Sequence, residues 1–321
     1  MKFRTEIEPA PARAAIGYGN RILALGSCFA ATLSERLSRA KFHISANPSG
    51  VLFNPLSIAR AIRSYADAGP VCREELFSDG ECWRHYAFHG DFSDPDPDEA
   101  LRRMNAARQA GAEALRGADR VILTFGTAWV FEHDGEVVAN CHRQPAAEFV
   151  RRRLRVGEIV EAFAQLIEGP LAGKEILLTV SPVRHLADGL AGNSLSKATL
   201  RVAAGELSER FETVSYYPAF EILTDDLRDY RFYAEDLVHP APQAVEYIWE
   251  RVAADLLSEE ARRMLPEVEA LVAAAAHRPR HPHGEEHRAF CRQQLQRIAA
   301  FPELDFRSEA EYFRRCIEIN S

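Results

Sequence analysis

The chain has 321 residues, of which 47% are hydrophobic and 27% are charged, and its formal net charge at pH 7 is −8. This balance is ordinary for a globular protein with a sizeable core, and the negative charge argues against nucleic acid as a partner. No apolar stretch is long enough to span a membrane, and the first residues lack the apolar core of a signal peptide. We therefore expect no membrane partner. The six cysteines form no CxxC pair, so we expect a reduced, cytoplasmic compartment.

Apolar runs along the chain predict four buried strands that alternate with helical patterns. The strands cover residues 22–25, 120–127, 174–180 and 213–216. The helices cover residues 28–42, 56–66, 98–116, 156–168, 194–211 and 242–257. A hairpin around Asp134-Gly135 is predicted for residues 129–140, strands or a hairpin for 81–92, and a loop for 44–55. We therefore expect a mostly parallel sheet covered by helices on both faces.

The composition changes near the C-terminus, beyond Ser258. An Ala-rich helical segment (259–276) is followed by a Pro/His-rich linker (277–286) and a charged helical segment (287–317). We divide the chain into residues 1–257 and a helical extension over 258–321. The histidines that suggest a metal site here are His277, His281, His283 and His287. Their Pro/Arg-rich setting indicates a solvated linker instead, so no metal is expected.

The predicted strand over 22–25 ends in Gly26-Ser27, directly before a helical pattern. A serine at such a corner lies beside unpaired backbone N–H groups and the positive end of the helix dipole. Both favour a nucleophile whose attack generates an oxyanion. The alternative is that Ser27 is an ordinary helix cap. The neighbouring Cys28 is expected to point into the helix–sheet packing and to behave as a small hydrophobic residue.

An acid and a base lie close together much further along the chain, at Asp236 and His239. We expect His239 to accept the proton of Ser27, and Asp236 to fix the tautomer of that histidine. In isolation, this pair would be interpreted as a capping aspartate and a surface histidine. Open α/β sheets bind ligands outside the carboxyl ends of their strands, where these loops are expected to meet.

The string Leu25-Gly26-Ser27-Cys28-Phe29-Ala30 resembles the signature of the GSCFA domain family, a branch related to the SGNH (GDSL-like) hydrolases. Three further segments resemble that family, at residues 47–55, 179–185 and 232–240. The resemblance covers most of the chain. It implies a flavodoxin-like three-layer α/β/α sandwich of the SGNH-hydrolase kind and a catalytic triad of Ser27, Asp236 and His239.

The expected oxyanion hole begins with the backbone N–H of Ser27. Gly50 is the expected second donor, because a small residue lets the backbone approach a substrate; the alternative is a simple turn glycine. SGNH enzymes usually add an Asn from a Gly-x-Asn loop, but Thr127 stands at that position here. The third donor is therefore open between Thr127, Asn54 and Asn140.

Several polar residues near predicted strand ends are candidates for lining a substrate pocket, with solvated loop residues as the alternative. They are Asn54, Asn140, His142, His185 and Lys197.

The leading hypothesis is a cofactor-free serine esterase that removes a small acyl group, such as acetate, from a carbohydrate or similar alcohol through an acyl-enzyme. One alternative is an acyltransferase that uses the same triad. Another is a non-catalytic carbohydrate-binding or scaffolding domain that keeps the fold.

Overall fold

A sheet of five parallel strands forms the centre of the computed structural model, which describes residues 4–8, 15–282 and 284–318. The strands are β1 (Arg21–Gly26), β2 (His43–Ala46), β5 (Arg120–Phe125), β9 (Glu175–Val180) and β10 (Val214–Tyr217). Across the sheet they lie in the order β10-β9-β5-β1-β2, and each pair is parallel. Numbered along the chain, this is the flavodoxin-like order 2-1-3-4-5.

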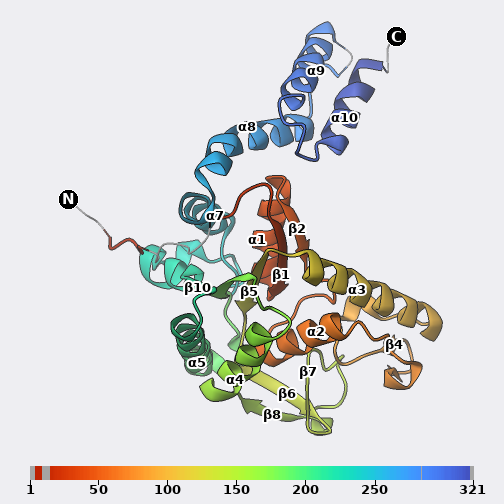
Figure 1. The fold of residues 1–321 in the computed structure, drawn as a ribbon, viewed down its shortest axis with the longest axis vertical. Helices are drawn as coiled ribbons and strands as arrows, with labels where there is room; N and C mark the ends of the chain where they lie inside the picture. Colours follow the sequence, from red (N-terminus) through yellow and green to blue (C-terminus); the bar gives the residue numbers. More distant parts are fainter. Residues whose placement is uncertain (1–3, 9–14, 283, 319–321) are drawn as a thin grey trace.

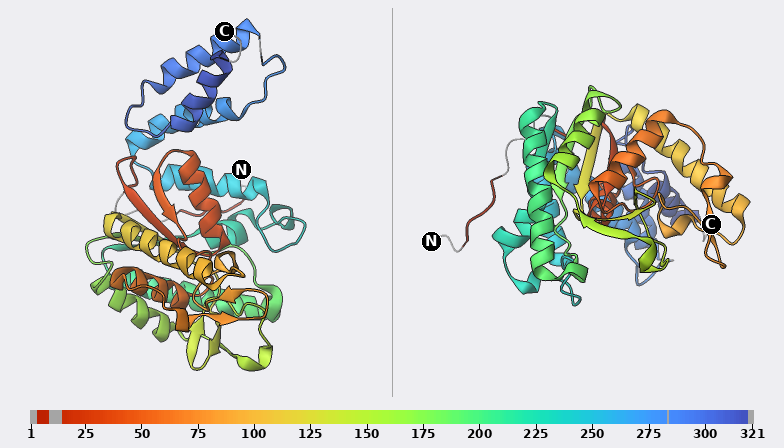
Figure 2. Two further views of the ribbon diagram at one scale, coloured as in Figure 1. Left: turned by 90° about the vertical axis from the view of Figure 1, so that its right-hand side faces the viewer. Right: turned by 90° about the horizontal axis from the view of Figure 1, so that it is seen from below.

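Helices cover both faces of this sheet, so the fold has three layers (Figures 1 and 2). In β1, Leu23 and Leu25 point to one face and Ile22 and Ala24 to the other, because side chains alternate along a strand. The first face packs against α2 (Pro55–Asp67), α3 (Pro97–Gly117), α4 (Val156–Glu168) and α5 (Gly189–Arg210). The second face packs against α1 (Cys28–Arg39) and α7 (Pro242–Leu256).

Shorter elements surround the carboxyl ends of the strands. The small strands are β3 (Phe77–Ser78), β4 (Trp83–Arg84), β6 (Trp129–His133), β7 (Glu136–Val138) and β8 (Val150–Arg153). The short helices are η1 (Arg73–Glu75), η2 (Gly90–Phe92), η3 (Ala146–Glu148), η4 (Leu186–Asp188), α6 (Ala219–Glu221), the π-helix η5 (Ile222–Leu227) and η6 (Tyr230–Phe232). Strands β7, β6 and β8 form an antiparallel sheet of their own, beside the end of β5.

Three helices follow α7 and lie at one end of the molecule (Figure 1). They are α8 (Glu259–Ala276), α9 (Glu285–Ile298) and α10 (Arg307–Glu318). The apolar cluster of α1 and α7 continues into α8 and reaches Leu304 and Phe306. Lys41 also forms a partly buried ion pair with Glu309 at 2.6 Å. The extension is therefore packed onto the α/β core by both apolar and ionic contacts.

Most predicted elements are confirmed, and the errors have clear causes. The predicted loop over 44–55 was wrong at its start, because β2 is a half-exposed edge strand without an apolar run. Strand β8 was not predicted for the same reason, since its residues Val150–Arg153 are mostly charged. The predicted helix over 287–317 is two helices, α9 and α10, because Pro302 lies in the segment that separates them. Within the described parts of the chain, no helix has the length and apolar character needed to cross a bilayer.

The corner after β1 depends on Gly26, which has a φ of +143°. A Cβ atom at this position would lie 2.2 Å from the carbonyl oxygen of Thr124 in β5. We expect Gly26→Ala to lower the free energy of unfolding by about 3 kcal/mol or more, because it combines backbone strain with steric overlap. Urea denaturation followed by circular dichroism measures this loss. The control is Gly19→Ala, where an added Cβ has no neighbour within 4 Å; an equal loss in both variants would contradict the prediction.

Candidate active site

Ser27 occupies the corner between β1 and α1, at the carboxyl end of the sheet. Its side chain is fully buried, and its Oγ has no hydrogen-bond partner. It holds the N-cap position of α1, yet it makes no capping hydrogen bond to the first turn. The capping alternative for Ser27 is therefore wrong. A buried hydroxyl without a partner is rare in native proteins and needs another explanation, such as a catalytic role.

Three strand ends meet around Ser27. The N–H of Gly26 donates to Oδ1 of Asn47, in the loop after β2, at 2.8 Å. The N–H of Gly126, after β5, donates to the carbonyl of Phe53 at 2.8 Å, and a Cβ on Gly126 would lie 3.2 Å from that of Ser27. Because strand order reverses between β1 and β5, Ser27 lies at the switch point where such sheets bind ligands.

Asp236 and His239 form the second half of the predicted site. Nδ1 of His239 lies 2.6 Å from Oδ2 of Asp236, whose other oxygen accepts the N–H groups of Val238 and His239. The hydrogen bond from the His239 side chain and these two N–H groups lower the pKa of Asp236 to about 2. The carboxylate is therefore ionised at neutral pH. When its Nδ1 carries the proton, neutral His239 has a free acceptor at Nε2.

Arg184 holds the loop that carries this pair, and the sequence did not single it out. Its N–H donates to the carbonyl of Val238 at 3.1 Å, and its guanidinium donates to that of Leu237 at 3.3 Å. The guanidinium also lies 3.8 Å from the ring centre of Tyr233. The signals for it in the sequence were its place in the segment 179–185 and its position beside His185 near a predicted strand end.

The Ser27–His239 contact of a complete triad is absent from this structure, since Ser27 Oγ has no hydrogen-bond partner. His239 is half-exposed, whereas Ser27 is buried. His185 lies near both regions: its ring makes an edge contact with Phe53 at 5.8 Å between ring centres, and its Nε2 is buried without a partner. Burial, with smaller effects from Lys197 and His239, lowers the pKa of His185 to about 4, so it is neutral at pH 7.

Gly50 does not supply the predicted second oxyanion donor in this structure. Its N–H donates to the carbonyl of Asn47 at 2.8 Å, closing a turn. Its φ is +85°, and a Cβ there would lie 2.2 Å from the Cβ of His89. The turn-glycine alternative accounts for Gly50, since it needs both the positive φ and the missing side chain.

The other predicted oxyanion donors are also engaged within the protein. The N–H of Ser27 donates to the carbonyl of Thr124 at 3.2 Å. The N–H of Thr127 donates to the carbonyl of Phe53 at 2.9 Å, and its hydroxyl bonds that of Ser196 at 3.1 Å. The strand-end loops thus satisfy one another's polar groups, as buried backbone must. The predicted oxyanion hole of Ser27, Gly50 and Thr127 is therefore not formed as expected.

A cavity of about 710 Å³ opens beside β6, next to the end of β5. Three of the five predicted substrate-binding residues, Asn54, Asn140 and His185, line it, as does Thr127. Its remaining walls are largely apolar, with aromatic rings from Phe53, Trp129, Phe131 and Phe149. Ser27 and His239 are not among the lining residues. Phe53 and His185 therefore connect the surroundings of Ser27 to this cavity.

The placement of His142 in the pocket wall was wrong. The side chain is buried, and its Nε2 donates to the carbonyl of His85 at 3.0 Å. Its N–H is held by Oδ1 of Asn140 at 2.8 Å. His142 therefore stabilises the loop behind the cavity.

The placement of Lys197 in the pocket wall was also wrong. Its fully buried Nζ donates to the carbonyls of Gly126 and Ser181 at 2.6 and 2.7 Å, which joins the segments after β5 and β9. Burial lowers its pKa to about 7. Cys28 behaves as predicted: it packs against the apolar cluster under α1, and burial raises the pKa of its thiol.

Two family models match the chain. The GSCFA family model matches residues 21–252. The model of the GSCFA domain protein, C-terminal domain, matches residues 268–319. No curated protein and no solved structure matches the chain. The first match includes Ser27, Asp236 and His239, and the second covers α9 and α10.

Lys197 predicts a pH-dependent stability. Its pKa is about 7 in the folded protein and about 10.4 in an unfolded chain, so between these values the unfolded state binds one more proton. The free energy of unfolding contributed by Lys197 therefore rises with pH, by about 1.4 kcal/mol per pH unit. Urea denaturation of the wild type and of Lys197→Met between about pH 7 and pH 9.5 measures the difference. Lys174→Met controls for the loss of a positive charge. If the free energies of unfolding of the wild type and Lys197→Met differ by the same amount at every pH, the lowered pKa of Lys197 is refuted.

Asp236 predicts the tautomer of His239. In Asp236→Asn, the amide oxygen can keep the two backbone hydrogen bonds, and the amide nitrogen then faces Nδ1. We expect neutral His239 to switch its proton from Nδ1 to Nε2, which nitrogen-15 NMR of labelled histidine detects. Glu235→Gln, a neighbouring carboxylate change, is expected to leave the tautomer as in the wild type. A proton that stays on Nδ1 in Asp236→Asn would contradict the prediction.

Proposed function

The chain belongs to the GSCFA family, and from this premise we propose that it is a serine hydrolase of the SGNH type. The reaction would be the removal of a small acyl group, such as acetyl, from a carbohydrate or related alcohol. One observation carries the proposal: the hydroxyl of Ser27 is buried, unpartnered and non-capping at the switch point of the sheet. The Asp236–His239 pair supports it, because it supplies an oriented base.

In the proposed mechanism, Ser27 Oγ attacks the ester carbonyl carbon while His239 Nε2 takes the hydroxyl proton. The tetrahedral intermediate collapses when His239 returns that proton to the leaving alcohol, and an acyl-enzyme remains on Ser27. A water molecule then gives a proton to His239 and attacks the acyl carbon. Collapse of this second intermediate returns the proton to Ser27 and releases the acid. Asp236 stays ionised and stabilises the imidazolium throughout.

This mechanism requires His239 to approach Ser27 when substrate binds. Catalytic hydrogen bonds are often long in ligand-free enzymes and tighten in the complex. The half-exposed imidazole of His239 leaves room for such a movement. For the oxyanion we propose the first-turn N–H groups of α1, since Ser27 does not cap them and the helix dipole favours negative charge there.

The alcohol part of the ester substrate would occupy the cavity beside β6. Its aromatic and apolar walls, with a few polar groups such as Asn140 and His185, suit a ligand with both apolar faces and hydroxyl groups. A sugar ester has this character. Thr127 and Phe53 line the part of the cavity nearest to Gly126. Gly126 in turn lies next to Ser27.

A second candidate, a non-catalytic carbohydrate-binding domain, is favoured by one observation. The N–H groups of Ser27, Gly50 and Thr127 are all engaged in internal hydrogen bonds, so the expected oxyanion donors are not free. Under this alternative the cavity would bind a sugar without turnover. Labelling by an active-site probe separates the two candidates.

We expect a fluorophosphonate probe to label Ser27, and peptide mass spectrometry to locate the adduct. Ser27→Ala and His239→Ala are each expected to abolish labelling and to lower kcat/KM on an acetyl ester by about a thousandfold or more, because both act in one chemical unit.

The controls are Ser34→Ala, a buried serine on the same helix, and His43→Ala, an exposed histidine of β2. Both should label and turn over as the wild type does. A folded wild-type protein that takes up no probe would overturn the hydrolase proposal in favour of the binding domain. A label on Cys28 would show that the reactive residue is Cys28 and not Ser27.

A further inference from the structure

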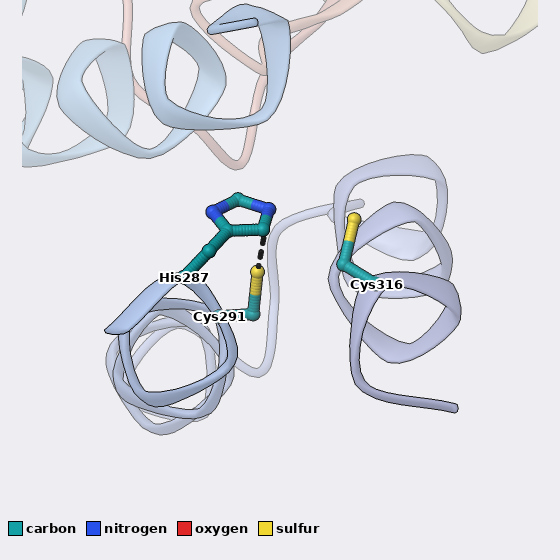
Figure 3. A group of neighbouring side chains, drawn as sticks. All are labelled: His287, Cys291 and Cys316. Carbon is teal, nitrogen blue, oxygen red and sulfur yellow. Dashed lines mark hydrogen bonds between the residues drawn. The ribbon is translucent and has the colours of Figure 1, made fainter. Parts of the chain in front are cut away.

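Three side chains that can ligate a metal meet between α9 and α10, in the C-terminal extension (Figure 3). They are His287 and Cys291 from α9 and Cys316 from α10. The first two are four residues apart, which places them on one face of their helix. Cys316 comes from the facing helix, and the three donor atoms all lie within 4.8 Å of one another. Two helices thus present three potential metal ligands to one point.

The distances suit a tetrahedral metal ion. With Zn–N of about 2.0 Å and Zn–S of about 2.3 Å, the nitrogen–sulfur edge of the tetrahedron is about 3.5 Å and the sulfur–sulfur edge about 3.8 Å. His287 Nε2 lies 3.5 Å from Cys291 Sγ, which matches the first edge. Since the Cys316 sulfur is within 4.8 Å of both, only small side-chain rotations are needed to complete three corners.

The donor set selects the kind of ion. Thiolate sulfur and imidazole nitrogen suit zinc, whereas magnesium and calcium prefer oxygen ligands. Among the described residues, no Asp or Glu side chain joins the group. Cys291 is fully buried, while His287 and Cys316 are half-buried, so the group lies at the helix–helix contact but within reach of solvent.

The small extension has reason to hold a metal. In α9 and α10 together, the buried residues are Cys291, Gln294, Ala310 and Phe313. A pair of short helices with so few buried side chains gains little from apolar packing. Small domains commonly compensate with a structural metal or a disulfide. A metal ligated from both helices would join α9 to α10 directly.

We propose that His287, Cys291 and Cys316 bind one Zn²⁺ ion, with the fourth position taken by water or an external ligand. Each thiol exchanges its proton for a bond to zinc, so two protons are released for each ion bound. This proposal replaces the expectation from the sequence that no metal is bound. That expectation was based on the histidines in and next to the linker and did not include the two cysteines. His277 and His281 do not belong to the group, and His283 lies outside the described residues.

The test uses the full-length protein, freed of metal with a chelator and kept reduced with a phosphine. Titration with Co²⁺ is expected to give one ion per chain, with the thiolate charge-transfer and visible bands of a tetrahedral cobalt site. Zn²⁺ should displace the cobalt and raise the melting temperature of the protein.

His287→Gln and Cys316→Ser change half-buried ligands and are expected to keep the fold, as circular dichroism will verify. Each should weaken cobalt and zinc binding by more than about a hundredfold. Loss of a residue that only hydrogen-bonds to a metal ligand weakens binding by up to about a hundredfold, so a larger loss indicates a direct ligand. Cys72→Ser, at an exposed cysteine in the α/β domain, is the matched control and should bind as the wild type does.

Two results would overturn the proposal. One is a wild-type protein whose cobalt spectrum lacks thiolate bands when the cysteines are reduced. This result would overturn the proposal even if Cys291 and Cys316 form a disulfide in air. The other is equal metal affinity in the wild type and both folded ligand variants. Neither readout depends on Ser27, so this test stands apart from that of the hydrolase proposal.

Discussion

The close approach of β1 and β5 at their carboxyl ends is the constraint on which the candidate site depends. Gly26 leaves β1 against the carbonyl of Thr124, and Gly126 leaves β5 against Phe53 and Ser27. At both points a side chain would overlap neighbouring atoms, so space requires glycine; at Gly26 the positive φ requires it as well. This packing closes the corner around Ser27 and leaves its hydroxyl buried without a partner. The same approach that makes the serine unusual also shields it from solvent.

Two basic side chains connect this corner to the rest of the site. Lys197 lies inside the protein and bonds the carbonyls that follow β5 and β9, while Arg184 bonds the loop that carries His239. A buried amine with a pKa of about 7 can be neutral and still donate to both carbonyls, which avoids the cost of a buried charge. The segment from Ser181 to His185 thus contacts both the side chain of Lys197 and the loop that carries His239.

The sequence predicted the framework well, because buried strands and amphipathic helices have strong patterns. The four apolar strands and the helices over 56–66 and 156–168 agree with the structure to within a residue or two. Edge strands such as β2 and β8 lack an apolar run, and their formation depends on a neighbouring strand for hydrogen bonds. The roles of Gly50, His142 and Lys197 were missed because each depends on which carbonyl lies opposite. That is a matter of tertiary packing.

By itself, the sequence determined the parallel α/β architecture, the strand-to-helix corner at Ser27 and the pairing of Asp236 with His239, because each is encoded by residues close together in the chain. Only the tertiary structure decided that the Ser27 hydroxyl is unpartnered, that the expected oxyanion donors are engaged, and that Lys197 is buried. It also brought Cys316 to His287 and Cys291. These features join segments that are distant in sequence. Local sequence patterns do not show which distant groups will form hydrogen bonds with one another.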